Sequence, residues 1–182
     1  MPTLLTPHAP TVTLNRLQSG VGTLTFEAAW SNAVGDLRFG CAYQLRSGLS
    51  STLQLSSGNR FAPPNSRRPI IVAHRDEFEQ ISIDLRQSKD LERLVVYGFS
   101  ASRAEIRWGG TLVVTTFGQD RIELPIEFRP SGGTAVFMSM YNVGGEFVIR
   151  AEMEIVNGEI RDAARAYGFD RITWLDDRTP VD

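Results

Sequence analysis

Three carboxylates, Asp76, Glu77 and Glu79, lie close together in the middle of the chain, just before an alternating apolar segment. Hard cations such as calcium take roughly six to eight oxygen ligands, often several from one loop. Asp36 could supply a further carboxylate if the fold brings it near. The alternative, which the residue chemistry favours, is a solvated loop whose carboxylates pair with nearby arginines such as Arg75.

A second candidate site is basic. Arg67 and Arg68 precede Pro69 in an irregular stretch at residues 56–69. Guanidinium groups bind anions such as phosphate through paired hydrogen bonds, so these arginines could form an anion site. The alternative is that they serve only solubility. Nucleic acid is not an expected partner, because no stripe of aromatic residues accompanies the arginines.

Nucleophilic catalysis finds little support in the residue types. Cys41 lies between Phe39 and Tyr43 in a strand-like segment, so we expect it to be a small buried hydrophobe. His74 and His8 are the only histidines, and the chain contains neither G-x-S-x-G nor H-E-x-x-H. A hydrolase that uses His74 is the least favoured alternative, and we expect no enzyme.

The composition is ordinary for a globular domain. The chain has 182 residues, 42% of them hydrophobic, and a net charge of −2. The single cysteine rules out an intramolecular disulfide and argues against a cysteine metal site. No apolar run approaches the roughly 20 residues of a membrane span, and the first ten residues do not resemble a secretory signal. We therefore expect a cytoplasmic protein with no transmembrane segment and no nucleic-acid partner.

The near-zero net charge hides an uneven distribution. Residues 31–75 contain six arginines and one acid, Asp36, whereas residues 76–182 contain 12 basic and 19 acidic residues. The first of these segments therefore carries +5 and the second −7. This asymmetry either has a function or is cancelled by ion pairs in the folded chain.

The elements that must position these residues are mostly strands. Alternating or continuously apolar segments predict strands at residues 11–14, 23–26, 38–45, 52–55, 70–72, 80–85, 91–99, 111–117, 121–128, 135–142 and 146–156. Apolar residues at helical spacing predict one helix at 159–167, which Gly168 ends. We expect an all-β, antiparallel β-sandwich with one short C-terminal helix. It forms a single domain over residues 1–175, followed by a loose polar tail at 176–182.

The order of these segments resembles the tellurium-resistance TerD family of bacterial stress proteins. The likeness covers residues 11–174 and rests on the order and spacing of several short pieces. These pieces are residues 11–14, the segment ending at Trp30, and residues 35–45, 79–85, 94–99, 142–147 and 166–169. The resemblance implies a β-sandwich that is not an enzyme, is linked to tellurite and stress resistance, and often binds calcium at one rim.

The calcium motif of the family is altered in this chain. The family ligands come from an aspartate-leucine-aspartate motif and from a later loop rich in aspartate and glycine. Asp36 matches the first aspartate, but Arg38 stands where the second would be, and the later loop keeps only Asp76 and Glu77. A guanidinium would repel the ion, at about 4 kcal/mol for unit charges roughly 4 Å apart near a surface. We therefore expect weak or no calcium binding, with Arg38 paired to Asp36, Asp76 or Glu77 in place of the metal.

Two functional hypotheses follow. The first is a non-catalytic, TerD-like stress-response domain that acts through protein partners, which could include other stress-response proteins, and needs no cofactor. The alternative is a calcium- or anion-binding sensor domain that uses a rim loop at residues 59–77. If the protein binds a cofactor at all, we expect calcium, with Asp36, Asp76 and Glu77 as its ligands.

Overall fold

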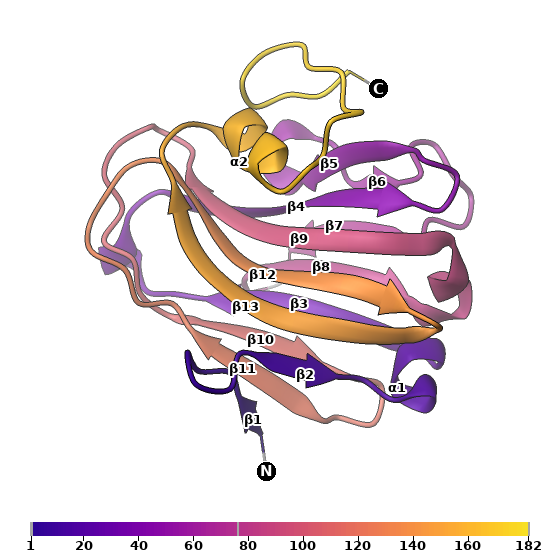
Figure 1. Ribbon diagram of the computed structural model, residues 1–182. Helices are drawn as coiled ribbons and strands as arrows, with labels where there is room; N and C mark the ends of the chain where they lie inside the picture. Colours follow the sequence, from indigo (N-terminus) through magenta and orange to yellow (C-terminus); the bar gives the residue numbers. More distant parts are fainter. Residues whose placement is uncertain (1, 76, 182) are drawn as a thin grey trace.

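The computed structural model describes residues 2–75 and 77–181, and these form two β-sheets that face each other (Figure 1). The first sheet has the order β1 (Thr3–Leu4), β11 (Arg121–Pro125), β10 (Thr111–Thr115), β3 (Thr23–Ala29), β8 (Glu79–Asp84), β7 (Ile71–Arg75) and β6 (Phe61–Ala62). The second has the order β2 (Thr11–Thr13), β13 (Glu146–Val156), β12 (Thr134–Val143), β9 (Leu91–Ser100), β4 (Leu37–Leu45) and β5 (Ser50–Gln54).

The predicted antiparallel β-sandwich is confirmed. Each of the predicted strand segments coincides with a strand, and neighbouring strands of the described chain run antiparallel except β1 and β11, which are parallel. The pattern missed only the two-residue strands β1 and β6 among these strands, because two residues are too few to show an alternation.

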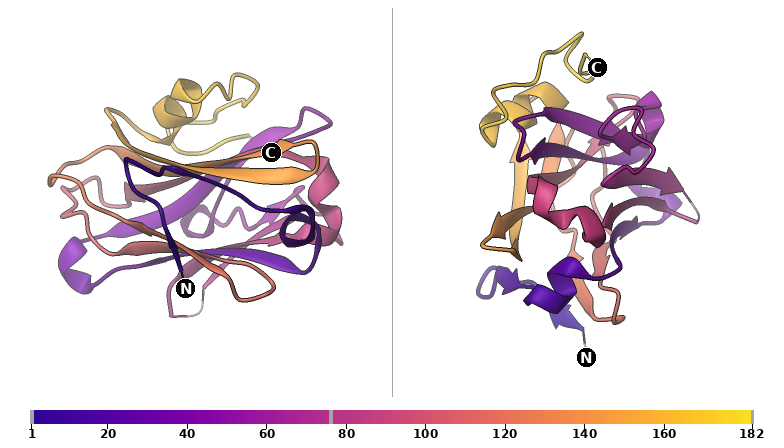
Figure 2. Two further views of the ribbon diagram at one scale, coloured as in Figure 1. Left: turned by 60° about the horizontal axis from the view of Figure 1, so that its bottom comes forward. Right: turned by 90° about the vertical axis from the view of Figure 1, so that its right-hand side faces the viewer.

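The two ends of the sandwich are built differently. At one end, which we call the rim, β4 and β8 begin and β7 and β9 end, so Leu37 pairs with Ser100 and Arg75 with Glu79. The opposite end carries the short helix α1 (Arg16–Gly20) and the 3₁₀ helix η3 (Leu85–Asp90), which lie together in the right-hand view of Figure 2. We call this the α1 end.

The α1 helix was not predicted, because five residues show little periodicity. It begins at a capping box: the Asn15 side chain accepts from the Gln18 N–H at 2.9 Å, and the Gln18 side chain accepts from the Asn15 N–H at 3.0 Å. The Gln18 amide also donates to the Asp120 carboxylate at 3.1 Å. This bond fixes the turn between β10 and β11 beside α1.

The predicted C-terminal helix is confirmed as α2 (Ile160–Ala166), and Gly168 follows it with a φ of +79°. The apolar face of α2 packs on the outer face of the second sheet, against Val95 and Tyr97 of β9 (Figure 1). This covering layer explains why β9 is almost continuously apolar: both of its faces are buried.

Residues 176–181, the described part of the tail predicted at 176–182, are not loose. The Arg178 side chain, 15% exposed, donates to the backbone oxygens of Ser100 and Ala101 at 2.7 and 3.1 Å and to the Glu159 carboxylate at 2.6 Å. Buried Pro180 follows it. Local composition misjudged this segment because its partners lie far away in the sequence.

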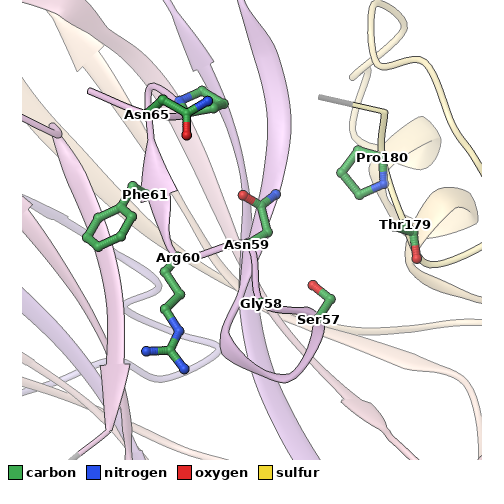
Figure 3. Close-up of a pocket in the computed structure, with 9 residues that line it drawn as sticks. Ser57, Gly58, Asn59, Arg60, Phe61, Asn65, Thr179 and Pro180 are labelled. Carbon is green, nitrogen blue, oxygen red and sulfur yellow. The ribbon is translucent and has the colours of Figure 1, made fainter. Parts of the chain in front are cut away.

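The docked segment also completes a small pocket of about 210 Å³ (Figure 3). Thr179 and Pro180 form one wall, and residues 57–61 with Pro64 and Asn65 form the rest. The same 57–61 stretch closes this side of the sandwich, because the Asn59 side chain donates to the Thr52 oxygen of β5 and the Arg60 oxygen accepts from the Ala73 N–H of β7. The long irregular stretch therefore joins the two sheets.

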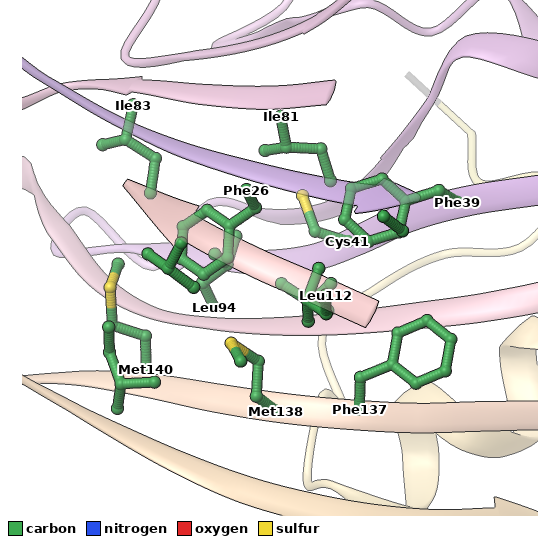
Figure 4. Packing of buried hydrophobic residues seen from close by; sticks show 14 of the residues in the cluster. Phe26, Phe39, Cys41, Ile81, Ile83, Leu94, Leu112, Phe137, Met138 and Met140 are labelled. Carbon is green, nitrogen blue, oxygen red and sulfur yellow. The ribbon is translucent and has the colours of Figure 1, made fainter. Parts of the chain in front are cut away.

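A single apolar cluster fills the space between the sheets (Figure 4). Phe26 and Ile81 enter from the first sheet and meet Phe137 and Met138 of the second, and all four are at most 1% exposed. Because alternate residues of a strand point to opposite faces, most strands send every second side chain into this layer. In β12 a register shift between Val136 and Met138 breaks this alternation, and the consecutive residues Phe137 and Met138 both belong to the core. Among the described residues, no helix has the length and apolar character required to cross a membrane.

Candidate functional site

The rim brings several of the predicted site residues together. Asp36 directly precedes β4, Arg38 is the second residue of β4, Arg75 ends β7 and Glu79 begins β8. β7 and β8 are neighbouring antiparallel strands, and their register places Arg75 opposite Glu79. Because β4 belongs to one sheet and β8 to the other, the rim charges join the two layers of the sandwich.

Of the three partners predicted for Arg38, namely Asp36, Asp76 and Glu77, the structure pairs it with Asp36. Arg38 Nη2 lies 3.1 Å from Asp36 Oδ1, and Arg38 Nη1 donates to the Leu37 oxygen at 3.2 Å. The two side chains are 34% and 40% exposed, so solvent screens the pair only in part. The arginine therefore engages the one carboxylate that matches the family motif.

Glu79 is the buried charge of this site. It is 5% exposed, and its Oε2 accepts a hydrogen bond from the Phe39 N–H at 2.8 Å, which links β8 to β4 across the sandwich. Burial raises the pKa of Glu79, while the Phe39 hydrogen bond and the charges of Arg38 and Arg75 act to lower it. The sequence placed Glu79 only in an acidic cluster and gave no sign that it would bridge the sheets.

The carboxylates of Asp36 and Glu79 are poorly placed to serve as ligands of a calcium ion. The Asp36 carboxylate is engaged by a guanidinium, one Glu79 oxygen is taken by a backbone N–H, and two arginines contribute positive charge beside Glu79. Within residues 2–75 and 77–181, no three acidic, histidine or cysteine side chains are grouped so that they could hold a metal. Glu77 is exposed, and Asp76 lies outside the described residues. Weak or absent calcium binding at Asp36, Asp76 and Glu77 therefore stays a prediction.

Arg67 and Arg68 lie at the α1 end, not at the rim. They line a groove of about 490 Å³ together with Pro69, Asp84, Arg86 and Gln87. Since Asp84 ends β8 whereas Glu79 begins it, the full length of that strand separates the two arginines from the acidic residues. The prediction of one rim loop over residues 59–77 is therefore wrong, because β6 and β7 run through it and divide it between two ends.

Cys41 has no exposed surface and lies in the core between the sheets (Figure 4). Burial raises the pKa of its thiol well above the ordinary value, which keeps the thiol protonated. The prediction of a small buried hydrophobe is confirmed.

The structure also pairs His74 with a serine. His74 Nε2 lies 2.8 Å from Ser82 Oγ, and both side chains are half-buried on the outer face of β7 and β8. A nucleophilic serine needs its histidine oriented by a third group and oxyanion donors beside it. Among the described residues, no carboxylate is bonded to His74, and neither residue lines one of the pockets described above. The pair is a cross-strand contact of an open sheet face.

Comparisons with known proteins add no relative: a scan against protein-family models matches none, and a search of curated proteins finds no match. The likeness to the TerD family therefore rests on the residues quoted above, and the family assignment stays a prediction.

Proposed function

We propose that this protein is a non-catalytic β-sandwich module of the TerD type that acts in stress response through protein partners and does so without calcium. One observation carries the calcium-independent part of the proposal: the ion pair between Arg38 and Asp36 at the rim. It occupies the place where the resemblance puts the calcium ligands.

The rim charges balance without a metal. Asp36 and Glu79 carry negative charge, and Arg38 and Arg75 carry positive charge close to them. Calcium binding would have to displace Arg38 from Asp36 and bring a divalent cation next to a guanidinium, which costs electrostatic free energy. The Phe39 N–H keeps Glu79 in place in either case. These contacts support a rim that is closed by protein charges.

Calorimetric titration with calcium tests the rim. The wild-type protein should show no micromolar binding, whereas Arg38→Asp should gain affinity because it restores a carboxylate and removes the positive charge. Arg38→Met is the matched control, since it removes the charge without adding an oxygen ligand and should gain less. A micromolar site in the wild-type protein would refute the calcium-independent rim.

A second experiment addresses the cellular role. Deleting the gene should lower the growth of the source cells on tellurite, and the wild-type gene should restore it. Tagged protein from stressed cells should capture the same partners with and without a calcium chelator. Unchanged tellurite tolerance after deletion would contradict the stress-response assignment, and partners lost on chelation would contradict the calcium-independent mode.

A further inference from the structure

The groove at the α1 end combines several arginines with little opposing charge. Its lining carries three positive charges, Arg67, Arg68 and Arg86, against one negative charge, Asp84, which leaves a net charge of two positive units. Arg67 and Arg68 are exposed, and neither forms an ion pair within the described part of the chain. Their guanidinium groups are therefore available to a ligand.

The third arginine is held in place. Arg86 Nε and Nη2 each donate to the Asp84 carboxylate at 2.9 Å, and the Arg86 N–H donates to the same carboxylate at 3.1 Å. This fork leaves the Nη1 donors of Arg86 unused. An arginine fixed by a carboxylate loses less conformational entropy when it binds an anion than a freely rotating one does.

The two walls of the groove are tied together by Gln87. Its Nε2 donates to the Pro69 oxygen at 3.3 Å and to the Asp84 carboxylate at 3.3 Å. The Arg68 N–H is also held, by Ser66 Oγ at 3.1 Å. The loop that carries Arg67 and Arg68 is thus fastened to η3, which carries Arg86, and the groove has a defined shape.

From this arrangement we infer that the groove of Arg67, Arg68 and Arg86 is a binding site for a phosphate group. A phosphate presents several acceptor oxygens and up to two negative charges, which match a net positive groove with multiple guanidinium donors. The site is separate from the rim, so it stands or falls independently of the proposed function.

The phosphate can come from a free metabolite or from a lipid headgroup. The surroundings of the groove make the second source worth a separate measurement, because α1 packs against η3 and carries Leu17, which is 70% exposed. Phe117, 64% exposed, lies beside α1, in contact with the position of Gly22. Exposed apolar side chains next to a cationic site are typical of surfaces that contact lipid.

Two binding measurements on the full chain test the inference. Inorganic pyrophosphate is titrated by calorimetry, and binding to vesicles of phosphatidylcholine with phosphatidic acid is followed by sedimentation, with pure phosphatidylcholine vesicles as the blank. The double variant Arg67→Gln/Arg68→Gln should bind about tenfold more weakly or worse, since it removes charge-assisted hydrogen bonds to the anion. The control Arg129→Gln/Arg165→Gln removes the same charge from exposed arginines elsewhere and should bind as the wild type does.

Saturable pyrophosphate binding that the groove variant loses and the control keeps supports a free phosphorylated ligand. The same selectivity with phosphatidic acid vesicles alone supports a lipid headgroup. The inference is overturned if the wild type binds neither, or if both double variants weaken binding equally, since that result means unspecific attraction to positive charge. Thermal melting of the two variants verifies that both are folded.

Discussion

At the scale of single residues, Glu79 is the most consequential side chain of the rim. It is buried, it carries the hydrogen bond between the sheets, and its carboxyl has a raised pKa. The folded protein thus holds a proton there more tightly than the unfolded chain does. Stability should fall as the pH rises from about 4.3, the ordinary glutamate pKa, through the raised pKa of the folded state.

Glu79→Gln should therefore be more stable than the wild type at neutral pH, because the amide oxygen can still accept from Phe39 and no charge is buried. The difference in unfolding free energy should shrink as the pH falls and wild-type Glu79 becomes protonated. Urea denaturation across this pH range measures it. Glu79→Ala is the control and should lose about 1–3 kcal/mol, since the Phe39 N–H is left without an acceptor. A difference that grows toward acid pH would contradict the argument.

The ion pair of Arg38 could be predicted from the sequence, whereas its other charged neighbours could not. An ion pair of Arg38 with Asp36, Asp76 or Glu77 was predicted from the replacement of a motif carboxylate by an arginine, and the structure shows the pair with Asp36. The contribution of Glu79 and Arg75 could not be predicted in the same way. Their distance from Arg38 depends on which strands of the two sheets face each other.

At the scale of elements, the pairing of β3 with β10 depends on a glycine. Gly110 has a φ of +101°, and a Cβ atom built there would lie 2.2 Å from the Ala29 backbone oxygen. The adjacent Thr111 pairs with Ala29 in the ladder between the two strands. A side chain at this position would push the strands apart at the point where their pairing begins.

Gly110→Ala should consequently destabilise the protein by about 2–5 kcal/mol, through both the left-handed backbone and the collision. Gly144→Ala is a matched control, because Gly144 also has a positive φ of +62° but has nothing within 4 Å of the added Cβ. It should cost only about 1–2 kcal/mol. Chemical denaturation measures the free energy of unfolding of both variants. Equal losses of this free energy would show that the close approach of position 110 to Ala29 does not affect stability.

At the scale of the whole molecule, the uneven charge of the sequence is largely retained in the fold. Of the six arginines in residues 31–75, only Arg46 forms an ion pair with the acidic later part of the described chain, to Glu92 at 3.9 Å. Arg38 pairs with Asp36 of its own segment. Ion pairs within the described residues therefore do not cancel the asymmetry, and the groove at the α1 end keeps part of its positive charge.

The single core shared by both sheets predicts how the whole molecule responds to a cavity. Phe26 has no exposed surface and packs in the cluster between the sheets, so Phe26→Ala should lose about 3–5 kcal/mol of unfolding free energy. Leu17→Ala is the control, since Leu17 is 70% exposed and its change should stay within about 0.5 kcal/mol. Urea unfolding followed by fluorescence measures both. A small loss for Phe26→Ala would mean that the sheets can close over the cavity.

Local sequence patterns were enough to predict the sandwich, the C-terminal helix, the burial of Cys41 and every strand of the described chain except the two-residue β1 and β6. These features follow from alternation and helical spacing within a few residues, and such short-range patterns are visible in one chain. The strand order became known only from the folded chain. The same holds for three contacts that depend on it: the hydrogen bond from Phe39 to Glu79, the shared groove of Arg67, Arg68 and Arg86, and the docking of Arg178 against β9. These contacts join residues far apart in the chain, so the entropic cost and the geometry of bringing them together depend on the packing of the whole sandwich.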